Sequence, residues 1–178
     1  MPTYLPWLLD ELAAAGGAFR VTSVTDLTAV RADVVVNATG LGARELAGDS
    51  ALTGVRGQVV RVADPGLAGW TLDEDHPDGM VYVVPRGTDV VCGGTALDGD
   101  ESTGPDPVEA ERILARCRAL VPELANAQVI GHAVGVRPAR PAVRLERAGD
   151  VVHCYGHGGA GVTLSWGCAD DVVRLVGR

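Results

Sequence analysis

The spacing of apolar positions along the chain predicts a mixture of helices and strands. Apolar residues recur with helical periodicity in three segments, residues 4–15, 107–119 and 162–175. Alternating or β-branched apolar runs predict strands at 18–24, 32–37, 55–63, 69–74, 80–85, 89–96, 127–138, 142–146 and 151–155. Segment 32–37 is apolar enough for burial on both faces, and residues 38–48 predict a turn into a short helix. Because strands dominate the middle and helices lie at both ends, we expect an α+β fold with a mixed β-sheet.

The segment 151–176 carries the clearest local signal. A β-branched strand pattern leads into the glycine loop GHGGAG, residues 156–161, and a helical pattern follows at once. Such an arrangement directs a helix N-terminus at an anionic or electron-rich ligand. The loop satisfies GxGxxG through Gly156, Gly158 and Gly161, but no second strand and no acidic residue about 20 positions further on complete a dinucleotide-binding unit. We therefore expect the loop to face a cofactor without forming the pyrophosphate cradle of a complete Rossmann unit.

Composition and charge restrict the class of protein. The 178 residues are about one domain in length, and 47% hydrophobic and 21% charged residues are typical of a globular protein. The net charge of −8 argues against nucleic acid and anionic membranes as partners, and no apolar stretch approaches the roughly 18 residues of a membrane span. The four cysteines form no CxxC pair, which predicts reduced thiols and a cytoplasmic location.

Six motifs follow one another in an order typical of one enzyme family. They are YLPWLLDELAAAGG (4–17), VVNATGLGARELAGD (35–49), GVRGQVVRV (54–62), YVVPRGTDVVCGGT (82–95), GVRPARPAVRLE (135–146) and YGHGGAGVTLSWG (155–167). Through them the chain resembles the D-amino-acid oxidase family, flavin enzymes of the glutathione-reductase-like superfamily. The resemblance covers only about the C-terminal half of the family pattern, without its N-terminal strand, GxGxxG turn, helix and ribose-binding acidic residue. We therefore expect the sequence to be a fragment.

The resemblance also implies a domain organisation, a cofactor and partners. Residues 1–50 would belong to an incomplete FAD-binding domain, residues 51–141 would form a β-rich substrate-binding domain, and residues 142–178 would return to the FAD-binding domain. The implied cofactor is FAD, and the implied partners are a small D-amino acid and oxygen. A separate N-terminal half or a homo-oligomer is left open.

Three residues match family positions that bind the substrate. The family arginine that binds the substrate carboxylate lies in a GxRPxRP segment and corresponds to Arg137, whose planar fork suits two parallel hydrogen bonds. Tyr82 matches a carboxylate-binding tyrosine, and Gly159 matches a residue whose carbonyl accepts a hydrogen bond from the substrate amine. Residue type alone would favour a surface salt bridge for Arg137 and leaves an ordinary edge tyrosine equally open for Tyr82. Asp78 stands where many animal members have a second tyrosine on a longer lid.

The resemblance assigns cofactor contacts to two glycine-containing segments. The first is the NATG turn, and the second is the glycine loop with the first helical turn after it. N–H groups at that helix end would stabilise negative charge on the flavin. For Thr163 the alternative is an ordinary residue of the first helical turn. The residues assigned are Thr39, Gly40, Gly158, Gly159, Gly161, Val162 and Thr163.

Two other kinds of site are weighed and set aside. His132, His153, Cys154 and His157 include metal-ligand types, but only the CxxH spacing of 154–157 is suggestive, and nothing in the sequence makes the other two converge. We therefore predict no metal site. Ser165 lies within a helical pattern and not on the GxSxG elbow of a serine hydrolase.

The resemblance implies FAD-dependent oxidative deamination of D-amino acids to 2-oxo acids, ammonia and hydrogen peroxide, with no side chain acting as acid or base. The alternatives are a related glycine, amine or D-aspartate oxidase, a non-catalytic fragment, and an amino-acid-binding module. We expect the 178 residues alone to bind FAD poorly and to be inactive.

The charges near the expected pocket predict a preference for neutral substrates. The segment 71–79, which we expect over the pocket, carries Asp73, Glu74, Asp75 and Asp78 and no arginine. Four carboxylates would repel a substrate with a second carboxylate. The nearest arginines in sequence, Arg86 and Arg140, are expected to face away from the pocket. We therefore expect neutral D-amino acids to be preferred over D-aspartate and D-glutamate.

Overall fold

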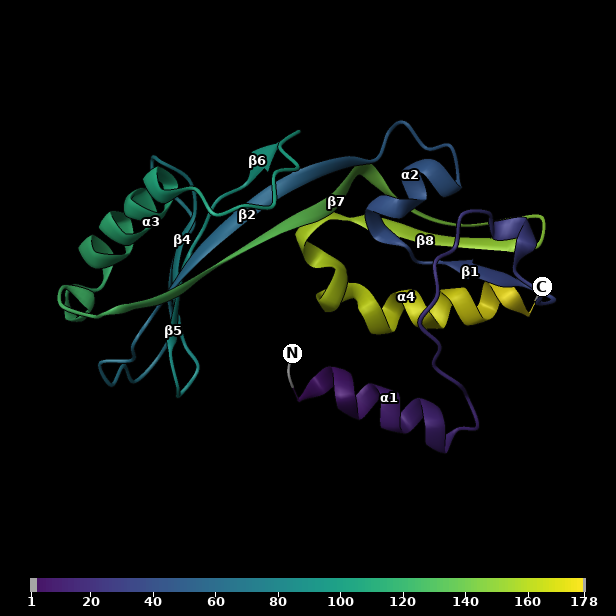
Figure 1. Cartoon of the computed structure of the whole chain (residues 1–178), viewed down its shortest axis with the longest axis horizontal. Helices are drawn as coiled ribbons and strands as arrows, with labels where there is room; N and C mark the ends of the chain where they lie inside the picture. Colours follow the sequence, from purple (N-terminus) through teal and green to yellow (C-terminus); the bar gives the residue numbers. More distant parts are fainter. Residues whose placement is uncertain (1–2, 178) are drawn as a thin grey trace. The chain divides into compact units, whose positions relative to one another are not determined.

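The computed structural model describes residues 3–177 (Figure 1). The chain divides into two compact units, Met1–Ala32 and Asp33–Arg178, which are described separately.

The first unit contains helix α1 (Tyr4–Ala14) and the short 3-10 helix η1 (Leu27–Ala29). The predicted helix over 4–15 is confirmed, and the chain turns at Gly16, where φ is +81°. The predicted strand over 18–24 is wrong, because this segment has no strand partner among the described residues and Val21 is 87% exposed. A β-branched run becomes a strand only where another strand completes its hydrogen bonds.

The second unit is built on one eight-stranded sheet. Its strands are β1 (Val35–Asn37), β2 (Thr53–Val62), β3 (Thr71–Asp73), β4 (Val81–Pro85), β5 (Val90–Gly93), β6 (Leu97–Asp98), β7 (Val129–Ala148) and β8 (Val151–His157). Their order is β1-β8-β7-β2-β5-β4-β3, with β6 paired to β2. Only β1 and β8 are parallel, and the other pairs are antiparallel. The sheet is therefore mixed, and the expected α+β class is confirmed.

Strand β7 joins two predicted strands, 127–138 and 142–146, into one. Its first part pairs with β2, from Thr53 opposite Ala139 to Val62 opposite Val129, and its last part pairs with β8 (Figure 1). The register shifts between Ala139 and Arg144, a stretch that contains Pro141, which has no N–H to donate. The residues just before this irregularity, including Arg137, lie where β7 leaves β2 and meets β8.

Helix α3 (Pro107–Leu120) covers β2, β4 and β5 and forms the main core with them. It begins where expected, because the Asp106 side chain accepts a hydrogen bond from the Val108 N–H at 2.8 Å and Pro107 occupies the first helical position. The short helix η3 (Pro122–Leu124) follows. The buried core residues are Val60, Val62, Val81, Val83, Val90, Cys92, Ala110, Ile113, Cys117, Val121 and Leu124.

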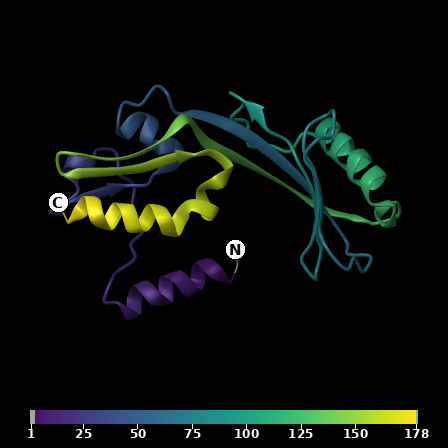
Figure 2. The same ribbon diagram turned by 180° about the vertical axis from the view of Figure 1, so that it is seen from behind.

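The other end of the sheet carries helices α2 (Ala43–Leu46) and α4 (Gly161–Val176), with η2 (Gly40–Gly42) and η4 (Gly158–Ala160) directly before them. Both views show α4 running beside β7 and β8 (Figure 2). The predicted strand 32–37 is reduced to β1, and Val36 is 43% exposed, so burial on both faces is wrong. Within residues 3–177, β1 is an edge strand that pairs with β8 alone. None of the helices described between residues 3 and 177 is long and apolar enough to cross a bilayer.

Candidate active site

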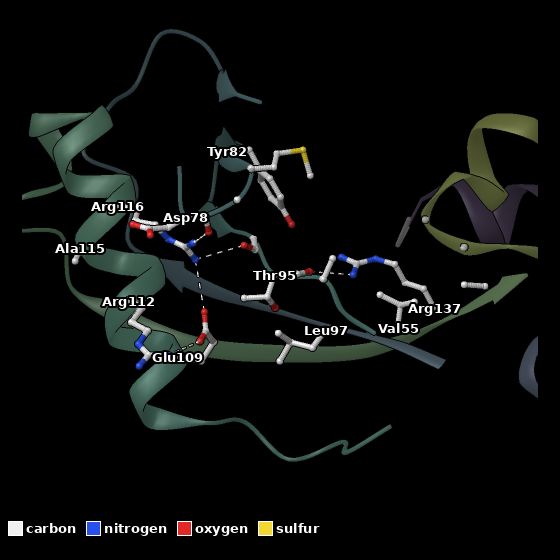
Figure 3. A pocket seen from close by; sticks show the side chains of 17 residues that line it. Val55, Asp78, Tyr82, Thr95, Leu97, Glu109, Arg112, Ala115, Arg116 and Arg137 are labelled. Atoms are coloured by element: carbon white, nitrogen blue, oxygen red, sulfur yellow. Dashed lines mark hydrogen bonds and ion pairs between the residues drawn. The ribbon is translucent and has the colours of Figure 1, made fainter. Parts of the chain in front are cut away.

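A cavity of about 1180 Å³ lies within the second unit (Figure 3). Strands β2, β4, β6 and β7, helix α3, the turn before β4, the segment after β5 and the glycine loop all contribute to its wall. Of the nine residues predicted to bind substrate or cofactor, four line the cavity: Tyr82, Arg137, Gly158 and Gly159. Asp78, at the position where many animal members have a tyrosine on the lid, lines it as well. The fold thus brings all three predicted substrate-binding residues into one space, although they lie up to 77 positions apart in the sequence.

Arg137 extends from β7 into the cavity, where it is half-buried. Its Nη1 donates to the Thr95 carbonyl at 3.0 Å, which fixes one edge of the guanidinium (Figure 3). No carboxylate of residues 3–177 forms an ion pair with it. The guanidinium lies against Gly57 of β2, where a Cβ would overlap it. An arginine with most of its donors unused, held in a cavity, is suited to bind a carboxylate from outside the chain.

Tyr82 extends from β4 toward the same part of the cavity (Figure 3). Its ring lies against Gly93 and Gly94, where a Cβ on Gly93 would overlap it. Burial raises the pKa of Tyr82, and the nearby Arg137 opposes that rise in part. The hydroxyl makes no hydrogen bond to another residue within 3–177. It is therefore a neutral donor available to a ligand that Arg137 binds.

The two segments predicted to contact a cofactor both approach β7 next to Arg137. A Cβ placed on Gly159 would lie 3.5 Å from Cδ of Arg137, and one placed on Gly40 would lie 3.7 Å from Cγ of Pro138. The NATG turn and the glycine loop are 116 or more positions apart in sequence, yet the fold sets them beside consecutive residues of one strand. Because the side chains of consecutive strand residues point to opposite faces of a sheet, the glycine loop and the NATG turn contact β7 from opposite sides.

The predicted cofactor residues differ in how they relate to the cavity. Gly158 and Gly159 line it, while Gly161, Val162 and Thr163 form the first turn of α4 just beyond its wall. No side chain caps this helix, so its first N–H groups stay open to a ligand. Val162 is 58% exposed. The cofactor roles of these residues remain predictions.

Thr39 is held in place by a buried polar group that the sequence did not mark. Its Oγ1 donates to Oδ1 of Asn37 at 2.7 Å, and Nδ2 of Asn37 lies 3.3 Å from Nδ1 of His153. Asn37 is fully buried. Burial lowers the pKa of His153, which supports a neutral ring in this pair. His153 thus has a structural partner.

The prediction that all four carboxylates of segment 71–79 lie over the cavity is wrong. Of the four acidic residues in 71–79, only Asp78 lines the cavity. Arg86 bonds Asp89 with its Nε at 2.8 Å, and Arg140 bonds Asp49 with its Nε at 2.9 Å, so both are engaged away from the cavity as expected.

Two arginines that the sequence analysis missed line the cavity from α3. Arg112 and Arg116 each lie 3.5 Å from a carboxylate oxygen of Glu109, which also lines it. Arg116 further donates to the carbonyls of Asp78 and Gly94 (Figure 3). Spacing of three, four and seven residues along one helix places the three side chains on one face. That spacing was readable in the sequence, but which way the face points was not.

The chain is similar to proteins of a known family. A family profile described as FAD dependent oxidoreductase matches residues 1–175. The chain belongs to this family. It is 52% identical over 184 aligned residues to a D-amino-acid oxidase of Rubrobacter xylanophilus, covering 99% of this chain and 56% of that protein. It is 42% identical to human D-aspartate oxidase, covering 98% of this chain and 53% of that protein.

The same fold is found among solved structures. Glycine oxidase from Geobacillus kaustophilus superposes with a TM-score of 0.73 over 83% of this chain and 42% of that chain, at 24% identity. The chain spans about half the length of the curated relatives it matches.

The cofactor of the family is FAD, and the residues present fit it. The uncapped start of α4 offers N–H groups to an electron-rich ring edge. The glycines at 40 and 159 have no Cβ, so a ligand can approach the backbone closely at each position.

Proposed function

We propose that the protein acts as an FAD-dependent oxidase of neutral D-amino acids. The observation that carries this proposal is the Arg137 guanidinium, half-buried in the cavity, unpaired with any carboxylate of the described residues, and adjacent to Gly159 of the glycine loop. The similarity to curated D-amino-acid oxidases supports the same activity.

In this proposal the side chains position the substrate and do not react with it. Arg137 binds the α-carboxylate through its free N–H groups, and Tyr82 donates a second hydrogen bond to the same carboxylate. By its resemblance to the family, the Gly159 carbonyl accepts a hydrogen bond from the amine. Three contacts to two groups of a chiral centre fix which face of the Cα–H bond meets the cofactor. When bound, FAD supplies the oxidation, and with oxygen and water the products would be a 2-oxo acid, ammonia and hydrogen peroxide.

The charges of the cavity support a substrate with a single carboxylate. Three arginines and two carboxylates line the wall, which leaves one uncompensated positive charge. Glu109 pairs with both Arg112 and Arg116, and Arg116 is also committed to two carbonyls. Of the three described arginines that line the cavity, Arg137 is the one that has no carboxylate partner. One free cation matches one α-carboxylate.

The test of the activity is peroxide formation by the FAD-loaded enzyme at the full length of its relatives. D-alanine and D-methionine should yield one peroxide per 2-oxo acid formed, and L-alanine should yield none. A matching rate with glycine or with amines that lack a carboxylate would instead favour a glycine or amine oxidase. Absence of peroxide with every amine, in protein that retains bound D-alanine, would favour a binding module.

The same assay separates neutral from acidic substrates. We expect a higher kcat/KM for D-alanine than for D-aspartate, because a second carboxylate would meet Asp78 and an already paired Arg116. A D-aspartate oxidase is the second candidate function, favoured by the two α3 arginines and by the human relative. A higher kcat/KM for D-aspartate, lost in Arg116→Ala, would establish that candidate instead.

A finer part of the proposal concerns the 178 residues by themselves. We expect them to retain FAD weakly and to turn over little substrate. If one flavin per chain co-elutes with these 178 residues in gel filtration, that expectation is refuted. The proposed role of Arg137 would be unaffected by this result.

A further inference from the structure

A cluster of two thiols and an imidazole lies beside the glycine loop, outside the cavity. It consists of Cys154 on β8, His157 at the end of β8 and Cys168 on α4. One ligand atom from each residue lies within 4.8 Å of the other two, and Cys168 Sγ is 3.3 Å from His157 Nε2. All three residues are half-buried, so solvent reaches them.

The fold creates this cluster from residues that the sequence separates. In a regular strand, positions 154 and 157 would face opposite sides of the sheet. Gly156 has φ of +87°, and His157 has the helical backbone values of −78° and −4°, so the chain turns between them. The turn brings the His157 ring to the side of Cys154, and α4, which packs on β8, adds Cys168 from seven residues inside the helix.

We infer that Cys154, His157 and Cys168 form a zinc site with an open fourth position. Two thiolates and one imidazole are the ligand types that Zn²⁺ prefers, and a structural or reactive site needs three or four of them. In a tetrahedral Zn²⁺ site, bond lengths of about 2.3 Å to sulfur and 2.05 Å to nitrogen place the sulfur and nitrogen atoms about 3.5 Å apart. The distance of 3.3 Å between Cys168 and His157 already approaches that value.

Binding needs little rearrangement of this part of the chain. Two bound sulfurs would lie about 3.8 Å apart, and the present ligand atoms are all within 4.8 Å. The two thiols would release their protons to solvent, and the resulting site of two thiolates, a neutral imidazole and Zn²⁺ carries no net charge. The metal would link His157, directly before Gly158 and Gly159, to α4. It would therefore stiffen the loop that lines the cavity.

The other two cysteines cannot form such a site. Cys92 and Cys117 are both fully buried in the main core. Within residues 3–177, neither belongs to a group of three or more possible metal ligands. They serve as an internal reference for experiments on the cluster.

The experiment is a titration of the reduced, EDTA-treated full chain with Zn²⁺, followed by calorimetry and by equilibrium dialysis. We expect one Zn²⁺ per chain, and Co²⁺ in its place should give the visible absorption of a tetrahedral thiolate site. Cys154→Ser and Cys168→Ser should each weaken Zn²⁺ binding by at least about tenfold. Removing a residue that only hydrogen-bonds to a metal ligand already costs about that much, and these cysteines would be ligands themselves. His132→Gln alters an exposed histidine outside the cluster and should leave binding unchanged.

A second measurement uses only the unaltered chain. Zn²⁺ should protect Cys154 and Cys168 from alkylation, while buried Cys92 and Cys117 should react slowly with or without the metal.

Two results would overturn the proposal: equal alkylation of Cys154 and Cys168 with and without Zn²⁺, or Zn²⁺ binding that survives both serine substitutions. A Cys154–Cys168 disulfide in the isolated chain, with no Zn²⁺ bound after reduction, would show a redox pair instead and would also overturn it.

Discussion

Replacement of Arg137 tests the proposed substrate site most directly. In the structure one of its N–H groups is used by the Thr95 carbonyl, and the others are free of described partners. Lysine at this position keeps the charge but cannot make two parallel hydrogen bonds to one carboxylate. Alanine removes both the charge and the hydrogen bonds, and it leaves the substrate carboxylate without a partner.

The magnitude follows from the number of hydrogen bonds lost. A hydrogen bond to a charged group contributes about 1.5–3 kcal/mol, so Arg137→Lys should lower kcat/KM by about 10- to 150-fold. Loss of the whole partner costs about 2–5 kcal/mol, so Arg137→Ala should lower it by about 30- to 4000-fold. Because Arg137 is only half-buried, solvent screening favours the lower end of both ranges.

The assay is steady-state peroxide formation from D-alanine by the FAD-loaded enzyme at the length of its relatives. The loss should appear mainly in KM, and it should nearly vanish for an amine substrate that lacks a carboxylate. Arg174→Lys is the matched control, since Arg174 is 67% exposed on α4 and pairs with Asp171 outside the cavity.

A particular pattern of results would refute the assignment. If Arg137→Lys and Arg137→Ala both keep kcat/KM on D-alanine close to the parental value, Arg137 does not bind the carboxylate. The same conclusion follows if both variants lose activity equally on substrates with and without a carboxylate, because that pattern indicates damage to the fold.

Three further substitutions test the surroundings of the site. Gly57→Ala should displace the Arg137 guanidinium, because a Cβ at Gly57 would overlap it, and should raise KM for D-alanine by about tenfold or more. An unchanged KM would contradict this contact. Tyr82→Phe should raise KM by about tenfold at an unchanged melting temperature, because its hydroxyl has no described partner to lose, and a lower melting temperature with normal KM would indicate a structural role. Asp49→Asn should destabilise the fold to urea at neutral pH, because the hydrogen bond from Tyr155 lowers the pKa of Asp49 in the folded state. The stability that a lowered carboxyl pKa contributes is present above the unfolded-state pKa of about 3.9 and is lost as pH falls. The difference in free energy of unfolding between the parent and Asp49→Asn should therefore narrow below about pH 4. A difference that does not change with pH would refute this role of Asp49.

Local signals in the sequence account for several elements of the fold. The aspartate and proline at 106 and 107 start α3 where predicted, and the glycine loop leads from β8 into α4 as expected. These features succeed because capping and backbone restriction act between residues a few positions apart, whatever the rest of the chain does. The family resemblance, carried by whole motifs, assigned Arg137, Tyr82 and Gly159 to one substrate site, and all three line the cavity.

Other features depend on which segments meet. Residues 18–24 have a strand pattern but no strand partner, and two predicted strands merge into β7 because β2 and β8 both pair with it. A strand's hydrogen bonds are supplied by other segments, so its own residues cannot determine whether it forms or where it ends.

The charges and ligands around the site were also decided by tertiary structure. The sequence placed four carboxylates over the cavity, but only Asp78 lines it, and Arg116 comes in from α3 because the apolar face of that helix packs on the sheet. Cys168 joins Cys154 and His157 only because α4 packs on β8. The sequence by itself determined which chemical groups the chain carries and the local turns that present them. Their mutual distances were set by burial of distant apolar surfaces, which no local pattern encodes.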